Sequence, residues 1–299
     1  MLKKVHKIIY FNNAFLEREK CKIHSMSPSS QFGINVFEGI RGYYNKSRYI
    51  FRLDEHLNRL SKSLDEIKIK FNLDYSLIRD IIEKLLNIND CKTNFSIRII
   101  IYLENDGTWS DVTEGQMFIA GINNKVSSFN SSIVNSSSIS LINRISNNQM
   151  PAYIKSGANY LNSRYAFLDV QRRGFEEAVL LNNRGNIAEG TGSNIFFVSN
   201  NKLITPSTDQ SILNGITRNS LIQIAKKNNI SVEERPVNKN EIKYFDEAFF
   251  CGTAAEIKLI KKIDDIYYKN KEVTKFLYNE YKLAVKNEKY KSFNWCKKI

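Results

Sequence analysis

Lys155 stands in the stretch PAYIKSGANY, among small and apolar neighbours. The chain has 44 lysines and arginines, most of which must be solvated surface charges. A lysine with small neighbours can lose its water shell, and desolvation favours the neutral amine that attacks carbonyl groups. Lys155 is therefore a candidate nucleophile, if other segments bind the group that it attacks.

Two small-residue turns could hold a phosphate group. In LNGITRNSLIQIA, Gly215 and Thr217 are expected at the start of a helix, where backbone N–H groups and the helix dipole favour an anion. In CGTAAE, Thr253 adds a hydroxyl to a turn that follows an expected strand. Glu189, in NIAEGTGSNIFF, is expected in a turn between two strands. Each residue alone has an ordinary explanation, but an amine, a phosphate site and a carboxylate are the three groups that pyridoxal phosphate requires.

The elements that must position these residues read as α+β in two domains. Leu57, Leu60, Leu64 and Ile67 recur at helical spacing after Asp54, and a second apolar stripe spans 77–86. FSIRIIIYL and QMFIAGI then read as strands, rich in β-branched and aromatic residues. The polar stretch 123–136 is expected to link a small α/β domain, 1–122, to a larger one, 137–299, that carries Lys155. In the second domain a helix is expected over 159–173, followed by alternating strands and helices.

Composition excludes several classes of protein. No stretch approaches the roughly 18 apolar residues of a membrane helix, and the N-terminal apolar run is too short for a signal peptide, so a cytoplasmic location is expected. Four cysteines without paired spacing and three histidines predict free thiols and no metal site. The net charge of +13 could attract nucleic acid, but the lysines are scattered, and nucleic-acid binding would leave the candidate residues unexplained.

Six segments together resemble the branched-chain amino acid aminotransferase-like family, the class IV aminotransferases of pyridoxal-phosphate fold type IV. They run in the family's order from about residue 30 to 265: FGINVFEGIRGYY, FRLDEHLNRL, IKSGANYLNSR, GFEEAVLLNNRGNIAEGTGSNIFFV, LNGITRNSL and DEAFFCGTAAEI. One such motif would be weak, whereas six in order are specific. The resemblance implies the two-domain, D-amino acid aminotransferase-like architecture and pyridoxal 5'-phosphate as cofactor.

The resemblance also implies roles for the cofactor-binding residues. Lys155 matches the catalytic lysine that forms the internal aldimine and moves the proton. Glu189 matches the carboxylate at the pyridine nitrogen, and Arg59 matches the arginine that pairs with the phosphate. The remaining matches surround the ring or its phosphate: Tyr160, Leu213, Gly215, Ile216, Thr217 and Thr253.

The matches on the substrate side are Phe37, Gly39, Arg41, Arg98, Thr253 and Ala254. The turn at Thr253 would receive the α-carboxylate, and Arg98 would sense a second carboxylate, as in glutamate. The local sequence departs from the family, because SIRI stands at Ser96–Ile99 where a tyrosine and a proline are usual. Phe32 and Trp109 are further departures from the family's sequence. The alternative to substrate binding by Arg98 is that this arginine is only a structural residue of its strand.

The resemblance implies an aminotransferase that moves an amino group between an apolar, most often branched-chain, L-amino acid and 2-oxoglutarate, in amino-acid biosynthesis. A D-amino acid transaminase or an aminodeoxychorismate lyase of the same fold type is the alternative, because both share Lys155 and Glu189. The family's usual state implies a homodimer, and neither nucleic acid nor a membrane is expected as a partner.

Overall fold

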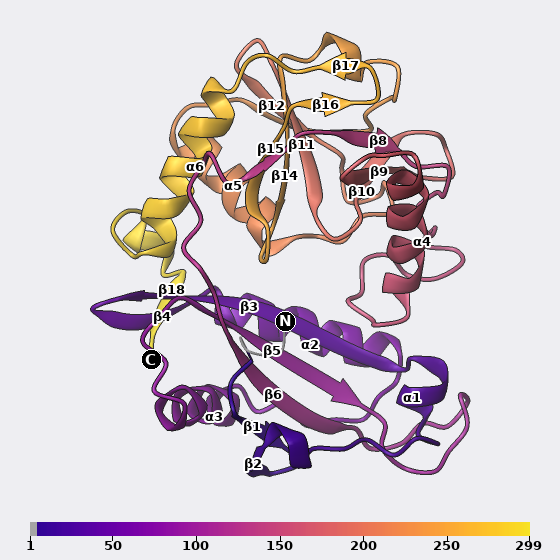
Figure 1. Cartoon of the computed structure of the whole chain (residues 1–299), viewed down its shortest axis with the longest axis vertical. Coiled ribbons are helices and arrows are strands. Elements are labelled where there is room, and N and C mark those ends of the chain that lie inside the picture. Colours follow the sequence, from indigo (N-terminus) through magenta and orange to yellow (C-terminus); the bar gives the residue numbers. More distant parts are fainter. Residues whose placement is uncertain (1–4) are drawn as a thin grey trace. The chain divides into compact units, whose positions relative to one another are not determined.

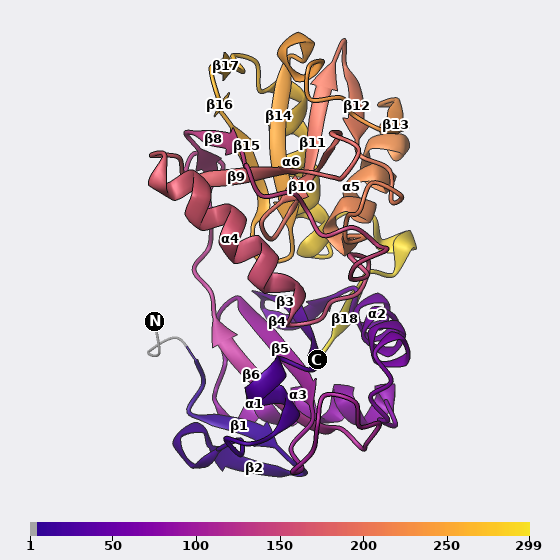
Figure 2. The same cartoon turned by 90° about the vertical axis from the view of Figure 1, so that its right-hand side faces the viewer.

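The computed structural model describes residues 5–299, and its chain divides into two compact units (Figures 1 and 2). Of the described residues, the first unit contains 5–126, 154–158 and 284–299, and the second contains 127–153 and 159–283. This division differs from the expected one in two ways. The short segment around Lys155 and the C-terminal tail both belong to the first unit, although each lies well beyond the expected linker.

The first unit is built on one antiparallel sheet of seven strands in the order β18-β4-β3-β5-β6-β1-β2. The strands are β1 (Ile8–Phe11), β2 (Ala14–Glu17), β3 (Asn35–Asn45), β4 (Ser47–Phe51), β5 (Phe95–Tyr102), β6 (Gln116–Asn123) and β18 (Cys296–Lys298). The helices are α1 (Pro28–Phe32), α2 (Leu53–Glu66) and α3 (Tyr75–Ile88), with short 3-10 turns at Arg18–Lys20 and Lys291–Phe293. The two expected helices and the expected β5 and β6 strands are confirmed.

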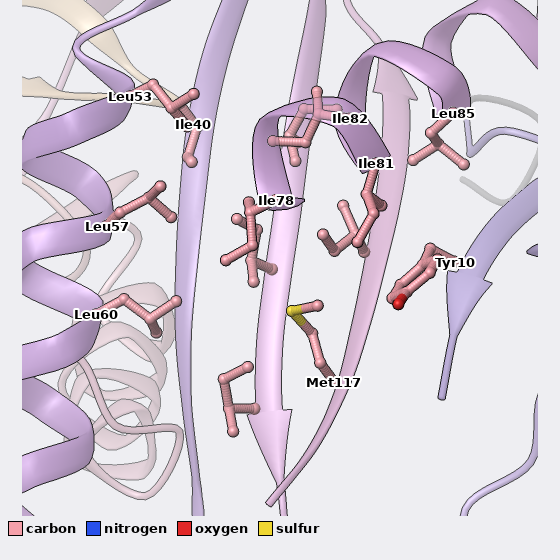
Figure 3. Close-up of a cluster of buried hydrophobic side chains, with 14 of the residues drawn as sticks. Tyr10, Ile40, Leu53, Leu57, Leu60, Ile78, Ile81, Ile82, Leu85 and Met117 are labelled. Carbon is pink, nitrogen blue, oxygen red and sulfur yellow. The ribbon is translucent and has the colours of Figure 1, made fainter. Parts of the chain in front are cut away.

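The apolar stripes of α2 and α3 cover one face of this sheet. Leu53, Leu57 and Leu60 recur along α2 at the spacing of one helical face, and all three are buried. Figure 3 shows them, together with side chains of α3, facing side chains of the strands such as Ile40. Asp74 begins α3 by accepting a hydrogen bond from the Leu77 N–H group, a common N-cap.

The second unit has two mixed sheets, ordered β10-β9-β8-β16-β17 and β13-β12-β11-β14-β15-β7. Their strands are β7 (Ile133–Val134), β8 (Ser137–Ile139), β9 (Glu177–Leu181), β10 (Ile187–Gly190), β11 (Asn194–Ser199), β12 (Lys202–Thr205), β13 (Val232–Glu234), β14 (Glu247–Gly252), β15 (Glu256–Ile260), β16 (Lys262–Ile263) and β17 (Ile266–Tyr267). Side chains from both sheets join one core cluster. The helices are α4 (Asn159–Arg172), α5 (Ile216–Lys227) and α6 (Glu272–Val285), with a 3-10 turn at Ile242–Tyr244.

Helix α4 buries its small side chains and exposes large apolar ones. Ala166 and Val170 pack against β9, which Figure 2 shows beside the helix. Leu161 and Tyr165, two large apolar residues of the same helix, are 56% and 58% exposed. Small side chains suit the buried side of α4, because they let this helix approach β9 closely.

The structure also bears on the classes excluded by composition. All four cysteines are free. Within residues 5–299, every helix is too short or too polar to cross a lipid bilayer. In the same residues, no group of three histidine, cysteine, aspartate or glutamate side chains is arranged to hold a metal ion.

Candidate active site

In the first unit, the expected substrate residues share one face of the sheet. Successive side chains of a strand point to opposite faces, so Phe37, Gly39 and Arg41 of β3 lie together on the face opposite Ile40. Arg98 of β5 is the direct cross-strand partner of Gly39 and therefore lies on this same face. The sheet brings these four residues together, with the helices on its other side.

Phe37 is the centre of this group. The guanidinium carbon of Arg98 lies 4.8 Å from the centroid of the Phe37 ring, and Lys155 Nζ lies 4.8 Å from the same centroid. Arg98 lies over Gly39, where a Cβ atom would stand 3.9 Å from Arg98 Cζ, an ordinary van der Waals distance. Two cations over one ring make this face attractive to an anionic group.

The opposite face of β3 holds a buried ion pair. Glu38 Oε1 accepts a hydrogen bond from Arg59 Nε at 2.7 Å, and Glu38 Oε2 accepts one from Arg59 Nη2 at 2.9 Å. Nδ1 of His56, one turn before Arg59 on α2, lies 2.7 Å from Glu38 Oε2. Burial alone would raise the pKa of Glu38, but Arg59 and His56 together hold that pKa well below its usual range. Glu38 therefore fixes one edge of the guanidinium of Arg59.

Burial has the opposite consequence for His56, because it lowers the pKa of the imidazole below 6.5. As the pH falls through about 6.5, His56 binds a proton in the unfolded chain but stays neutral in the folded chain. The free energy of unfolding therefore falls as the pH falls below that value. We expect the urea midpoint to drop between about pH 7.5 and about pH 5.5, and His56→Gln to reduce this drop. An equal slope in the wild type and in His56→Gln would contradict the assignment.

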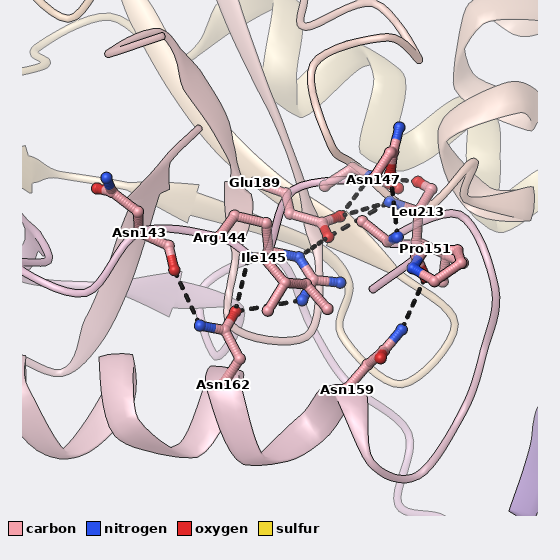
Figure 4. A network of polar contacts seen from close by, with 11 residues as sticks. Asn143, Arg144, Ile145, Asn147, Pro151, Asn159, Asn162, Glu189 and Leu213 are labelled. Atoms are coloured by element: carbon pink, nitrogen blue, oxygen red, sulfur yellow. Dashed lines mark hydrogen bonds and ion pairs between the residues drawn. The ribbon is translucent and has the colours of Figure 1, made fainter. Parts of the chain in front are cut away.

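In the second unit, Glu189 lies at the centre of a polar network (Figure 4). It accepts hydrogen bonds from Arg144 Nε at 2.9 Å, from Asn194 Nδ2 at 3.0 Å and from the Leu213 N–H group at 3.3 Å. The structure corrects its expected position, because Glu189 lies in strand β10 and is only 5% exposed. The turn comes immediately after it, at GTGS. These three partners are all donors, and they stabilise the ionised carboxylate.

Arg144 and Asn194 are site residues that the sequence analysis missed. Arg144 is buried, and its Nη1 atom donates to Asn162 Oδ1 of α4 at 3.3 Å. Asn194 Nδ2 also donates to the Leu213 carbonyl at 2.8 Å, so one amide joins Glu189 to the segment before α5. Asn194 was visible inside the quoted motif EGTGSNIFF, whereas Arg144 lies 45 residues before its partner and carries no local signal.

The beginning of α5 has the features expected of an anion site. Gly215 is the N-cap residue, and no side chain caps the helix there. A Cβ atom at Gly215 would stand 2.0 Å from Asn194 Oδ1, so only glycine lets the chain pass this side chain. Ile216 and Thr217 follow in the first turn, and both are buried.

Thr253 and Ala254 lie in the tight turn between β14 and β15. The turn ends at Glu256, whose φ of 56° is unusual for a residue other than glycine. Its carboxylate holds this conformation by accepting hydrogen bonds from Lys282 Nζ at 2.5 Å and from Ser127 Oγ at 2.6 Å. This ion pair between the buried Glu256 and the partly exposed Lys282, also missed by the sequence analysis, fixes the end of the turn.

The expected site residues are therefore divided between the two units. The first unit contains Phe37, Gly39, Arg41, Arg59, Arg98 and Lys155. The second contains Tyr160, Glu189, Leu213, Gly215, Ile216, Thr217, Thr253 and Ala254. Tyr160, at the start of α4, is partly exposed, and Trp109 is 72% exposed.

Comparison with known proteins identifies the family. The family model described as "Amino-transferase class IV" matches residues 35–263. The chain belongs to the class IV aminotransferases. It is thus an enzyme, a transferase, and its two units have the fold-type IV architecture expected from the sequence.

Relatives of this class IV aminotransferase match nearly end to end. A probable branched-chain-amino-acid aminotransferase of Aquifex aeolicus is 32% identical over 313 residues, covering 96% of this chain and 94% of the relative. The Thermoproteus uzoniensis branched-chain aminotransferase, solved with norvaline, has a TM-score of 0.92 at 30% identity, over 98% of this chain and 99% of that one. A "T.th." branched-chain amino acid aminotransferase, complexed with N-(5'-phosphopyridoxyl)-L-glutamate, has a TM-score of 0.91 at 27% identity, over 98% of both chains.

Proposed function

We propose that this class IV aminotransferase moves an amino group between an apolar, branched-chain L-amino acid and 2-oxoglutarate. The observation that carries the proposal is the arrangement around Phe37, where an apolar ring and two cations lie on one face. An apolar side chain can pack on the ring, and a carboxylate can pair with a cation. The branched-chain names of the relatives, and the glutamate adduct bound to one of the solved structures, agree with this choice of substrates.

We propose pyridoxal 5'-phosphate as the cofactor, because the residues present fit it. Lys155 would bond it covalently, Arg59 and the N–H groups of Ile216 and Thr217 would hold its phosphate, and Glu189 would accept a hydrogen bond from its ring nitrogen. Gly215 lets the chain pass Asn194 at the start of α5, and no side chain caps the helix there, as the binding of a phosphate at a helix start requires. When bound, the cofactor supplies an electron sink for the substrate's α-carbon.

The chain's own residues then divide the remaining work. Lys155 Nζ would act first as a general base that removes the proton from the substrate's α-carbon. It would then act as a general acid that donates this proton to the cofactor. The turn at Thr253 and Ala254 offers N–H groups and a hydroxyl to the α-carboxylate. The donors around Glu189 stabilise its carboxylate form, so that it could accept a hydrogen bond from the ring nitrogen.

The alternatives, a D-amino acid transaminase or an aminodeoxychorismate lyase, are not favoured by the relatives described above. A steady-state comparison of L-leucine, D-alanine and aminodeoxychorismate tests the proposal. We expect turnover with L-leucine and 2-oxoglutarate, and little with the other two compounds. Preferred turnover of either alternative substrate would contradict it.

Arg98 should decide between a dicarboxylic and an apolar partner substrate. A charge-assisted hydrogen bond contributes about 1.5–3 kcal/mol, which corresponds to about tenfold to a hundredfold in rate. We therefore expect Arg98→Met to slow the 2-oxoglutarate half-reaction by that factor and to leave the half-reaction with L-leucine nearly unchanged. Single-turnover measurements of both half-reactions check this. Equal losses would make Arg98 structural, and no loss would assign the second carboxylate to another residue, such as Arg41.

We also propose that the enzyme acts as a homodimer, as the family resemblance implies, and in the cytoplasm. The exposed apolar side chains of Leu161 and Tyr165 on α4 are candidates for contact with a second copy. Light scattering of the purified protein tests the assembly directly, and a monomeric mass across the working concentration range would rule out the dimer.

A further inference from the structure

The main chain at Lys155 is held by residues of the first unit, although the chain on both sides belongs to the second. The Lys155 carbonyl accepts a hydrogen bond from the Phe37 N–H group at 3.0 Å, and the Gly157 N–H group donates to the Asn35 carbonyl at 3.1 Å. The segment therefore lies beside the start of β3, in an isolated antiparallel bridge between Val36 and Ser156. These two hydrogen bonds hold the carbonyl side of the Lys155 main chain against β3.

The N–H group of Lys155 is held by a side chain of α2. The Lys155 N–H group donates to Ser63 Oγ at 3.1 Å, across 92 residues of sequence. Ser63 lies one turn after Arg59 on this helix and is 1% exposed. Its hydroxyl donates its single proton to the Arg59 carbonyl at 3.0 Å, which leaves its lone pairs to accept from Lys155.

We infer that Ser63 is a positioning residue for Lys155, which fixes its main chain against α2 and thereby the reach of its amine. The inference rests on the proposed role of Lys155. A lysine side chain is long and flexible, so its amine is delivered reproducibly only if its main chain is fixed. The same hydroxyl also ties Lys155 to the helix that presents Arg59, the expected phosphate ligand.

The helix offers a matched control. Ser61 lies two residues before Ser63 on α2, but it is half-buried rather than fully buried. Ser61→Ala removes the same hydroxyl from the same helix without touching the contact to Lys155. Ser63→Thr keeps a hydroxyl at the critical position and tests for rescue.

The test uses the full-length enzyme with its cofactor, and measures three quantities in Ser63→Ala, Ser63→Thr and Ser61→Ala. The first is the half-reaction rate with L-leucine at saturation, with its KM. The second is the pH dependence of the cofactor's absorbance. The third is amide hydrogen exchange in peptides that cover residues 154–158, which does not depend on activity.

For Ser63→Ala we expect a three- to tenfold lower half-reaction rate, about the effect of one buried hydrogen bond, with KM nearly unchanged. The pH profile of the absorbance should shift, and exchange at 154–158 should accelerate. Ser61→Ala should match wild type in all three, and Ser63→Thr should recover most of the loss.

Ser63→Ala with a wild-type rate and pH profile would overturn the inference, even if its melting temperature fell, because Ser63 would then be only structural. Unchanged exchange at 154–158 in Ser63→Ala would overturn it as well. These outcomes differ from failure of the proposed function, in which the wild-type enzyme itself would not transfer an amino group from L-leucine. In that case the hydrogen-exchange comparison still decides whether Ser63 fixes Lys155.

Discussion

Replacing Lys155 by alanine should abolish amino transfer, lowering the rate by at least about a thousandfold. In the proposed function this amine both bonds the cofactor and moves the proton at the α-carbon, so its loss would remove both tasks. Borohydride reduction of the wild-type enzyme should fix the cofactor to a peptide that contains residues 154–158. The Lys155→Ala protein should show no such label.

Lys62→Ala is the control for this result, because Lys62 is an exposed lysine of α2 in the same unit. It should retain wild-type activity and the label at Lys155. A cofactor label on a different lysine in the wild-type protein would contradict the assignment of Lys155. So would substantial amino transfer by Lys155→Ala.

Replacing Glu189 by glutamine should slow the reaction by about a hundredfold or more, the size of effect seen when one preorganised electrostatic contact is lost. The neutral amide cannot hold a proton on the ring nitrogen. In addition, Arg144, Asn194 and the Leu213 N–H group all donate to Glu189, so the new NH2 group would face one of these donors and lose that hydrogen bond. Stopped-flow measurement of the half-reaction checks the rate.

Arg59→Ala provides the contrast to Glu189→Gln. Its main effect should be weaker retention of the cofactor, measured by dialysis and by titration of the apo-enzyme, because Arg59 is assigned to the phosphate. Glu189→Gln should retain cofactor and lose rate. The reverse pattern in the two variants would show that the two roles were exchanged.

Local patterns in the sequence were sufficient to predict most elements of the fold. The helical spacing of Leu57 and Leu60 predicted α2, and the alternation of Phe37, Gly39 and Arg41 is what brings them to one face of β3. Such signals are local, because they depend on residues a few positions apart. They also allowed six quoted motifs to identify the family.

Contacts between distant segments could not be predicted in this way. Ser63 and Arg144 lie 92 and 45 residues from their partners, and nothing near either residue marks it as part of a site. The return of the tail to the first unit as β18 likewise depends on pairing with a distant strand, β4. Glu189 lies in a strand because β10 extends its pairing with the neighbouring β9 up to Gly190. Helix α4 packs closely on β9 through Ala166, and its larger apolar residues are therefore left exposed.

Following the nitrogen atom tests the proposed function most directly. The enzyme is incubated with 2-oxoglutarate and L-leucine labelled at its amino nitrogen, and the products are analysed by mass spectrometry. We expect labelled glutamate and the oxo acid of leucine in equal amounts, with no transfer from D-leucine. Two results would contradict the proposed function: no labelled glutamate and no oxo acid of leucine after incubation, or transfer of the label from D-leucine alone.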